Sequence, residues 1–154
     1  MDKVLKALTQ AADGVFAVDQ EQHIVFWNAA AECLLGYQAE EVYGRTCDEV
    51  FGGRAHPGCL VCCLDCPVVV AARRGDTVPA YNLLSQTKGG RPLLLNVSVI
   101  VLPVSEHTLA TIHLFRDMTS QMQYGSYVKQ RLHAAARLPS PPTASVSDAV
   151  TVVD

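Results

Sequence analysis

The sequence predicts an α+β domain in which a five-stranded antiparallel sheet carries short helices on one face. Two observations lead to this class. Apolar residues recur at helical spacing in some stretches and in short strand-like runs in others. The resulting order is a helix, two strands, several short helices, three strands and an exit helix, which closes most simply as one antiparallel sheet. With 154 residues, 49% of them hydrophobic, the chain is long enough for one core.

Cap and turn residues separate these elements. Asn28 is a preferred N-cap residue, and Gly36 supplies the usual helix stop seven residues after the helix begins. Pro67 suits the first position of a helix, because that position needs no backbone N–H donor. Helices are expected over 2–12, 29–35, 39–42, 47–51 and 67–72, and strands over 15–18, 24–27, 78–87, 92–104 and 107–116.

The three later strands carry the clearest sheet pattern. Within 92–104, the apolar residues Leu95, Val97, Val99 and Val101 occupy alternate positions, which predicts one wholly apolar face. By contrast, segment 52–65 is rich in Gly, Pro, Cys and His and is expected to be irregular.

Composition excludes several classes of function. The net charge of −3 argues against a broad surface for nucleic acid or anionic lipid, because such surfaces concentrate Lys and Arg. The longest apolar run, over 68–72, is far too short to span a bilayer, so no membrane partner is expected. The N-terminus begins an amphipathic stretch rather than a signal peptide, which predicts a cytoplasmic protein. No motif positions a catalytic nucleophile, so the chain is not expected to be an enzyme.

Five of the six cysteines lie within twenty residues of one another. In a reducing compartment, such a density indicates a metal site or redox chemistry rather than structural disulfides. Cys59, Cys62 and Cys66, with Pro67 after the last, have the spacing found in the latter part of the bacterial ferredoxin cysteine motif. An iron–sulfur cluster is therefore one interpretation of these cysteines, and a zinc site is another. The four preferred ligands are Cys47, Cys59, Cys62 and Cys66.

Other interpretations of these cysteines stay open. Cys63 is an alternate ligand or a redox partner, and His56 is the one histidine near enough in sequence to replace a thiolate. The thiols could instead form reversible disulfides without a metal, or pack as small buried hydrophobic groups. Cys33 lies within a predicted helix between apolar residues and is expected to belong to the core.

The chain resembles the PAS family over about residues 3–118. The resemblance is carried by an opening hairpin, by two motifs in the middle helices, and by an Asp-Met-Thr sequence at the end of the last strand. These motifs occupy residues 14–19, 23–28, 35–37, 40–45 and 115–119. The resemblance implies a sensory domain over 1–118, a signalling and dimerisation helix over 119–138, and a Pro/Ser-rich tail over 139–154. It also implies a homodimer that acts through an output domain or a partner regulator.

Segment 44–68 is also similar to a cysteine-containing bacterial PAS subgroup that often precedes LuxR-type helix-turn-helix domains. This similarity favours redox or oxygen sensing that feeds transcriptional regulation or signal transduction. The alternative is a cofactor-free interaction module with incidental cysteines. A light-sensing flavin site is not expected, because Thr46 stands where the flavin-adduct motif has asparagine. Haem is not expected either, because His23 and His113 are isolated histidines.

Overall fold

The computed structural model describes residues 2–56, 59–105, 108–121 and 126. Apart from the last, these residues belong to one compact unit, Met1–Met122. The predicted signalling helix therefore lies outside the described residues beyond its first turn, which is helical at 119–121. The predicted tail over 139–154 lies wholly outside them.

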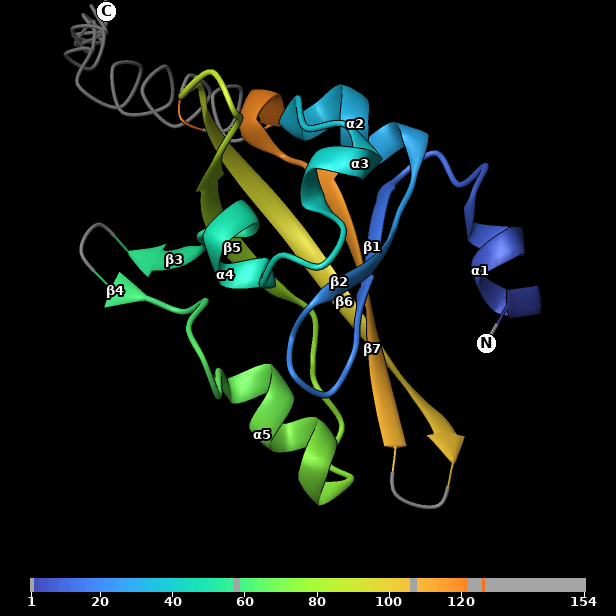
Figure 1. Ribbon diagram of the computed structural model, residues 1–154. Coiled ribbons are helices and arrows are strands. Elements are labelled where there is room, and N and C mark those ends of the chain that lie inside the picture. Colours follow the sequence, from blue (N-terminus) through green and yellow to red (C-terminus); the bar gives the residue numbers. More distant parts are fainter. Residues whose placement is uncertain (1, 57–58, 106–107, 122–125, 127–154) are drawn as a thin grey trace, which may run out of the picture. The chain divides into compact units, whose positions relative to one another are not determined.

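The described elements alternate as the sequence predicts, and Figure 1 shows their arrangement. The helices are α1 (Asp2–Leu8), α2 (Ala29–Leu35), α3 (Ala39–Val42), α4 (Cys47–Phe51) and α5 (Pro67–Arg74). The strands are β1 (Gly14–Val18), β2 (Ile24–Trp27), β3 (Arg54–His56), β4 (Cys59–Leu60), β5 (Tyr81–Gln86), β6 (Pro92–Ser105) and β7 (Thr108–Asp117).

These strands form one sheet in the order β2-β1-β7-β6-β5-β3-β4, with every paired neighbour antiparallel. The α+β class and the antiparallel sheet are confirmed. The expected number of five strands is wrong for the described chain, because β3 and β4 extend the sheet from the segment predicted to be irregular. Arg54 pairs with Leu84 at the edge of β5. Such short strands depend on that edge rather than on an apolar pattern of their own.

Two predicted elements are shorter in the structure. The first helix ends at Leu8 rather than at residue 12, and a turn follows at Thr9 and Gln10. The strand expected over 78–87 begins only at Tyr81. Pro79 accounts for the later start, because proline has no N–H to donate to a sheet ladder.

The two faces of the sheet hold separate hydrophobic clusters. Alternate residues of β1 divide between them: Phe16 belongs to the larger cluster with residues of α2, α3 and α4, whereas Ala17 packs with Leu5 and Leu8 of α1. Accordingly, α1 lies apart from the other helices (Figure 1). The period of two along the strand thus places α1 on the opposite face from the other helices.

Asn28 joins β1, the end of α1 and the start of α2. Its side-chain oxygen accepts the N–H groups of Ala31 and Val15, each at 2.9 Å, which confirms the predicted cap. Its side-chain nitrogen donates to the carbonyls of Leu8 at 3.2 Å and Asp13 at 3.1 Å. Gly36 ends α2 with φ +81°, a conformation that glycine adopts at little cost.

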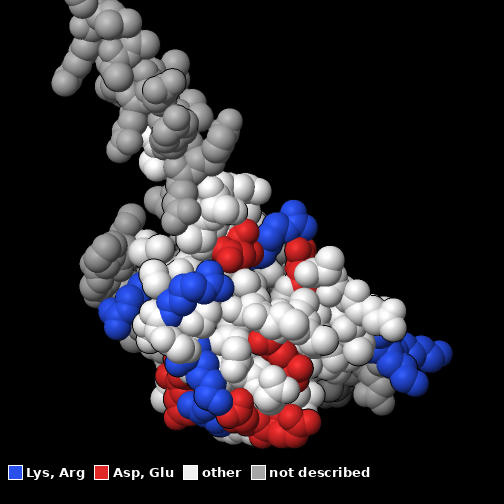
Figure 2. Space-filling view, turned by 90° about the horizontal axis from the view of Figure 1, so that it is seen from above, with Lys and Arg blue, Asp and Glu red and all other residues white. Residues whose placement is uncertain are grey.

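Charged side chains of both signs are interspersed on the face shown in Figure 2. Lys and Arg form no uninterrupted patch on that face. No helix in the described part of the chain combines the length and apolar character needed to cross a bilayer.

Candidate functional site

Two of the predicted cysteines meet at one side chain. Cys47 is the first residue of α4, and Cys66 is the N-cap residue of α5. The side-chain nitrogen of Gln22, in the turn between β1 and β2, lies 3.9 Å from the Cys47 sulfur and 3.8 Å from the Cys66 sulfur. Both cysteines are buried, each with 7% of its surface exposed. The fold therefore brings together thiols that stand nineteen positions apart in the sequence.

Cys62 joins this cluster because the chain folds back over α4. The N–H groups of Val61 and Cys62 both donate to the carbonyl of Gly53, at 2.9 and 3.0 Å. Gly53 lies against the side chain of Leu83, where a Cβ atom on residue 53 would lie 2.1 Å from a Leu83 methyl carbon. A residue with a side chain at position 53 would therefore displace Leu83.

The thiols of Cys47 and Cys62 are held in their neutral form. Burial, with smaller contributions from the neighbouring Cys62, Cys66 and Asp48, raises the pKa of Cys47 to about 12. Burial likewise raises the pKa of Cys62 to about 11, although the N–H of Gly53 opposes the shift. Burial and the same thiols raise the pKa of Tyr81. At neutral pH these sulfurs are protonated and weakly nucleophilic, because the thiolate is the reactive form.

The remaining cysteines differ in their surroundings. Cys63 is half-buried, and its thiol lies 3.7 Å from the carbonyl of Val61. Gln22 contacts the backbone carbonyl of Cys63 rather than its sulfur. Cys33 is exposed, which corrects the prediction that it belongs to the core. It lies on the solvent side of α2 and borders a shallow pocket of about 400 Å³ next to the Asp13–Arg116 ion pair. Helical spacing did not distinguish the two sides of so short a helix.

The predicted metal site is only partly described. The backbones of His56 and Cys59 form parts of β3 and β4, but their side chains lie outside the described residues. Among the described side chains, no group of three or more His, Cys, Asp or Glu residues is arranged to hold a metal ion. The four-cysteine iron–sulfur site and the zinc alternative therefore stay predictions.

Gln22 is the site residue that sequence reasoning missed. Gln22 ends a polar run over residues 19–22 between two strands, and turn residues of this kind are usually exposed. Gln22 is instead 2% exposed, and its φ of +67° is rare for a residue other than glycine or asparagine. Only the tertiary structure reveals the role, because its partners come from segments more than twenty positions away.

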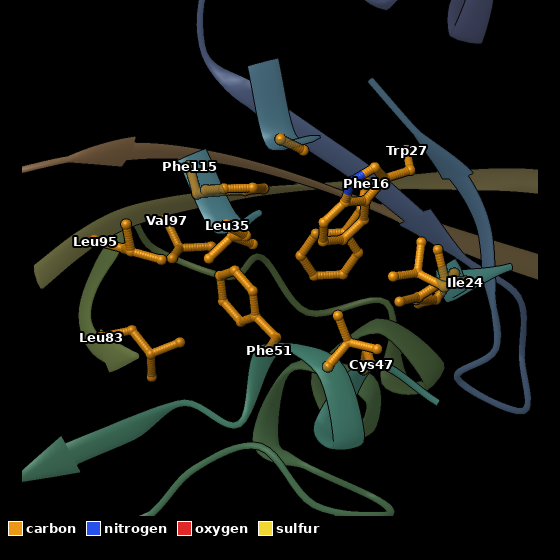
Figure 3. Packing of buried hydrophobic residues seen from close by; sticks show 14 of the residues in the cluster. Phe16, Ile24, Trp27, Leu35, Cys47, Phe51, Leu83, Leu95, Val97 and Phe115 are labelled. Atoms are coloured by element: carbon orange, nitrogen blue, oxygen red, sulfur yellow. The ribbon is translucent and has the colours of Figure 1, made fainter. Parts of the chain in front are cut away.

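Aromatic side chains fill the space between the sheet and the helices. The ring of Phe51 lies 5.0 Å from that of Phe16 and 5.2 Å from that of Phe115, measured between centroids. Figure 3 shows these three rings converging from α4, β1 and β7, with Cys47 at the margin of the cluster. Centroid separations of this size are those of packed aromatic pairs.

His113 is a second unusual polar residue in this core. It lies on β7, directly opposite Phe16, and its ring stacks on the Phe16 ring at 4.5 Å between centroids. Burial lowers the pKa of His113 to about 4, and its Nδ1 atom has no hydrogen-bond partner among the described residues. His113 is therefore a neutral core residue, whereas His23 is half-buried beside Asp19.

Comparisons with known proteins agree with this architecture. The family model described as PAS domain matches residues 12–120. The PAS domain of a protein from Colwellia psychrerythraea superimposes with a TM-score of 0.59 at 18% identity, covering 77% of this chain and 97% of that one. The photoactive yellow protein domain of the sensor histidine kinase Ppr from Rhodospirillum centenum gives 0.54 at 16% identity, covering 73% and 91%. No curated protein matches the chain.

A third similar structure is a light-oxygen-voltage domain studied with a flavin analogue. It gives a TM-score of 0.60 at 19% identity and covers 86% of this chain and 96% of that one. Identities this low show a shared fold alone. In this structure, the rings of Phe16, Phe51 and Phe115 pack in mutual contact between the sheet and the helices.

Proposed function

This chain belongs to the PAS family of sensory and signalling domains, and we propose that it responds to oxidants through the buried thiols of Cys47 and Cys66 and the half-buried thiol of Cys62. The proposal rests on one observation above all. The Gln22 nitrogen contacts the sulfurs of both Cys47 and Cys66, which come from the starts of two different helices. A covalent bond between these sulfurs would couple the two helices directly.

The proposed reaction uses a peroxide as the oxidant. One thiol attacks the peroxide, one peroxide oxygen is transferred to the sulfur as a sulfenic acid, and the other oxygen leaves as water. The second thiol then attacks the sulfenic sulfur, forms the disulfide and releases a second water. Two thiols lose two electrons and two protons in total, and one hydrogen peroxide becomes two waters.

Protonation of the thiols sets the sensitivity of this response. Because burial raises the pKa of Cys47 and Cys62, little thiolate is present at neutral pH. Attack on a peroxide is slow under these conditions. The site is therefore suited to sustained oxidative stress rather than to brief or weak exposure.

The output of the sensor is expected to pass from the sheet to a partner. Strand β7 ends at Asp117, whose side chain accepts the N–H of Thr119 at 2.9 Å and so caps the turn that follows. Thr119 also ties this turn to β6, because its hydroxyl accepts the N–H of Leu94 at 2.9 Å. We propose that a homodimer relays the change through residues 119–138 to an output domain or a partner regulator.

Thiol counting after peroxide treatment tests the proposal. We expect anaerobically reduced protein to lose two thiols per chain, and peptide mapping to find a disulfide that joins Cys47 to Cys66 or to Cys62. Cys47→Ser and Cys66→Ser should each reduce this loss, whereas Cys33→Ser, at an exposed cysteine, should leave it unchanged. Unchanged buried thiols after prolonged exposure would favour the cofactor-free interaction module.

Metal analysis of the same anaerobic preparation distinguishes a metal or iron–sulfur site from the metal-free disulfide. Bound iron with absorbance near 400 nm would point to a cluster held by Cys47, Cys59, Cys62 and Cys66, and bound zinc to a structural site. Either result would replace the metal-free disulfide chemistry, because coordinated thiolates are not free to form that bond.

A further inference from the structure

Gln22 connects three segments that are distant in the sequence. Its side-chain nitrogen donates to the carbonyl of Cys63 at 3.1 Å, and its side-chain oxygen accepts the N–H of Asp65 at 2.9 Å. Its backbone carbonyl accepts the N–H of Cys47 at 3.0 Å, at the start of α4. Gln22 therefore connects the turn between β1 and β2, in which it lies, to two other segments. Its side chain binds the cysteine segment, and its backbone carbonyl binds the first residue of α4.

The backbone conformation of Gln22 is unusual for a residue with a long side chain. Its φ of +67° lies in the left-handed region, where glycine and asparagine are favoured and glutamine is uncommon. Asp65 on the other side of the contact also has a left-handed φ, of +56°. The hydrogen bond from the Asp65 N–H to the Gln22 side chain thus links two residues that both have a left-handed backbone conformation.

The turn that carries Gln22 is itself fastened to the segment before α4. The N–H of Ile24 donates to the carbonyl of Arg45 at 2.8 Å, and His23 pairs with Thr46 as an isolated bridge. On its other side the turn continues into β1, which pairs along its length with β7. A displacement of Cys47 relative to Gln22 therefore acts on the end of the strand that lies beside β7.

We propose that Gln22 is the positioning residue of the redox pair: it holds Cys47 and Cys66 as separate thiols, and their disulfide releases the turn between β1 and β2. The proposal rests on the function proposed above, with a peroxide as oxidant. A disulfide requires a sulfur–sulfur distance of about 2 Å, so the two cysteines must be drawn together beside the amide that contacts both. Gln22 then loses its thiol partners and must shift.

The energetic consequence has a definite sign. Contacts that Gln22 makes only in the reduced state stabilise that state, so they oppose oxidation by the same free energy. Removing the amide should therefore favour the disulfide at equilibrium. A residue that merely supports the fold would leave this equilibrium unchanged, because it would stabilise the reduced and oxidised forms equally.

The test compares redox equilibria in glutathione buffers of graded composition. Gln22→Met keeps the length of the side chain without its polar atoms, and Gln22→Gly suits the left-handed φ should the methionine variant fail to fold. Both are expected to raise the equilibrium constant for the Cys47–Cys66 disulfide at least tenfold, measured by alkylation and mass spectrometry. Glu21→Ala, an exposed neighbour in the same turn, is the matched control and should leave it unchanged.

Hydrogen exchange supplies a second readout on the wild-type chain. On oxidation, amides of residues 19–24 should exchange faster, and Cys66→Ser should abolish that change. If the wild-type disulfide forms but neither Gln22 variant alters its equilibrium beyond twofold, the inference is wrong and the proposed function stands. If no disulfide forms in the wild-type chain, both are wrong.

Discussion

Two buried carboxamides, Asn28 and Gln22, join distant parts of this domain in contrasting ways. Asn28 is 1% exposed and Gln22 is 2% exposed. All four partners of the Asn28 side chain are backbone groups, at 2.9 to 3.2 Å. Gln22 has two backbone partners for its side chain, but its nitrogen also contacts two sulfurs at 3.8 and 3.9 Å.

The difference concerns what each junction can do. The partners of Asn28 have no chemistry of their own, so that junction has one state and serves the fold. The partners of Gln22 include thiols, which are weak acceptors and are open to oxidation. Asn28, just after β2, thus acts as a fixed cap. Gln22, just before β2, makes contacts that depend on the oxidation state of two thiols.

Removal of the Asn28 side chain should produce the largest effect. In Asn28→Ala, two N–H groups and two carbonyls lose their partner, and the cap of α2 disappears. We expect a loss of about 4 kcal/mol in the free energy of unfolding, measured by urea denaturation. Asn28→Ser retains a capping oxygen and should lose about half as much. A loss below about 1 kcal/mol for the alanine variant would show that water replaces these hydrogen bonds.

Acid should lower the stability of the fold through His113, a buried polar residue with fewer hydrogen bonds than either Asn28 or Gln22. His113 has its pKa lowered to about 4, from an ordinary value of 6.5, so the unfolded chain binds more protons between these values. Stability is therefore fully present above pH 6.5 and falls as the pH drops, by about 2 to 3 kcal/mol at pH 4.5. His113→Leu should lack this component of the pH dependence. An unchanged slope in that variant would assign the acid sensitivity to carboxylates instead.

Alkali should weaken the Gln22 junction and leave the Asn28 junction intact. Because the pKa of Cys47 is raised from 9.0 to about 12, stability is fully present below pH 9 and is lost as the pH rises. By pH 10.5 this thiol alone should account for about 2 kcal/mol. Absorbance at 240 nm reports the thiolate, and urea denaturation reports the stability. Cys47→Ala should remove this share of the alkaline loss, and an equal loss in that variant would contradict the assignment.

Local signals in the sequence were sufficient for most of the fold. Asn28 and Gly36 bound α2 as predicted, and Pro67 begins α5. Each of these depends on neighbours within a few residues along the chain. The strands β3 and β4 were missed because they depend on the edge of β5, which lies about thirty positions away.

The candidate site was predicted in its residue types but not in its geometry. The density of thiols drew attention to Cys47, Cys62 and Cys66, and the structure places these three together. Gln22 contacts the backbone carbonyl of Cys63 and not its sulfur, and Cys33 lies on the surface. Sequence spacing gave no reason to prefer Cys47 and Cys66 as a pair, since the side chain that joins them lies in a turn before both.

By itself, the sequence determined the α+β class, the order of most elements and the segment that is dense in cysteine, because periodicity, caps and cysteine density are local properties. Only the tertiary structure decided that the pKa values of Cys47 and Cys62 are raised, that Gln22 contacts the sulfurs of Cys47 and Cys66 and that aromatic rings fill the interior. Burial and contacts between distant segments set those properties, and they exist only once β1, α4 and α5 have packed together.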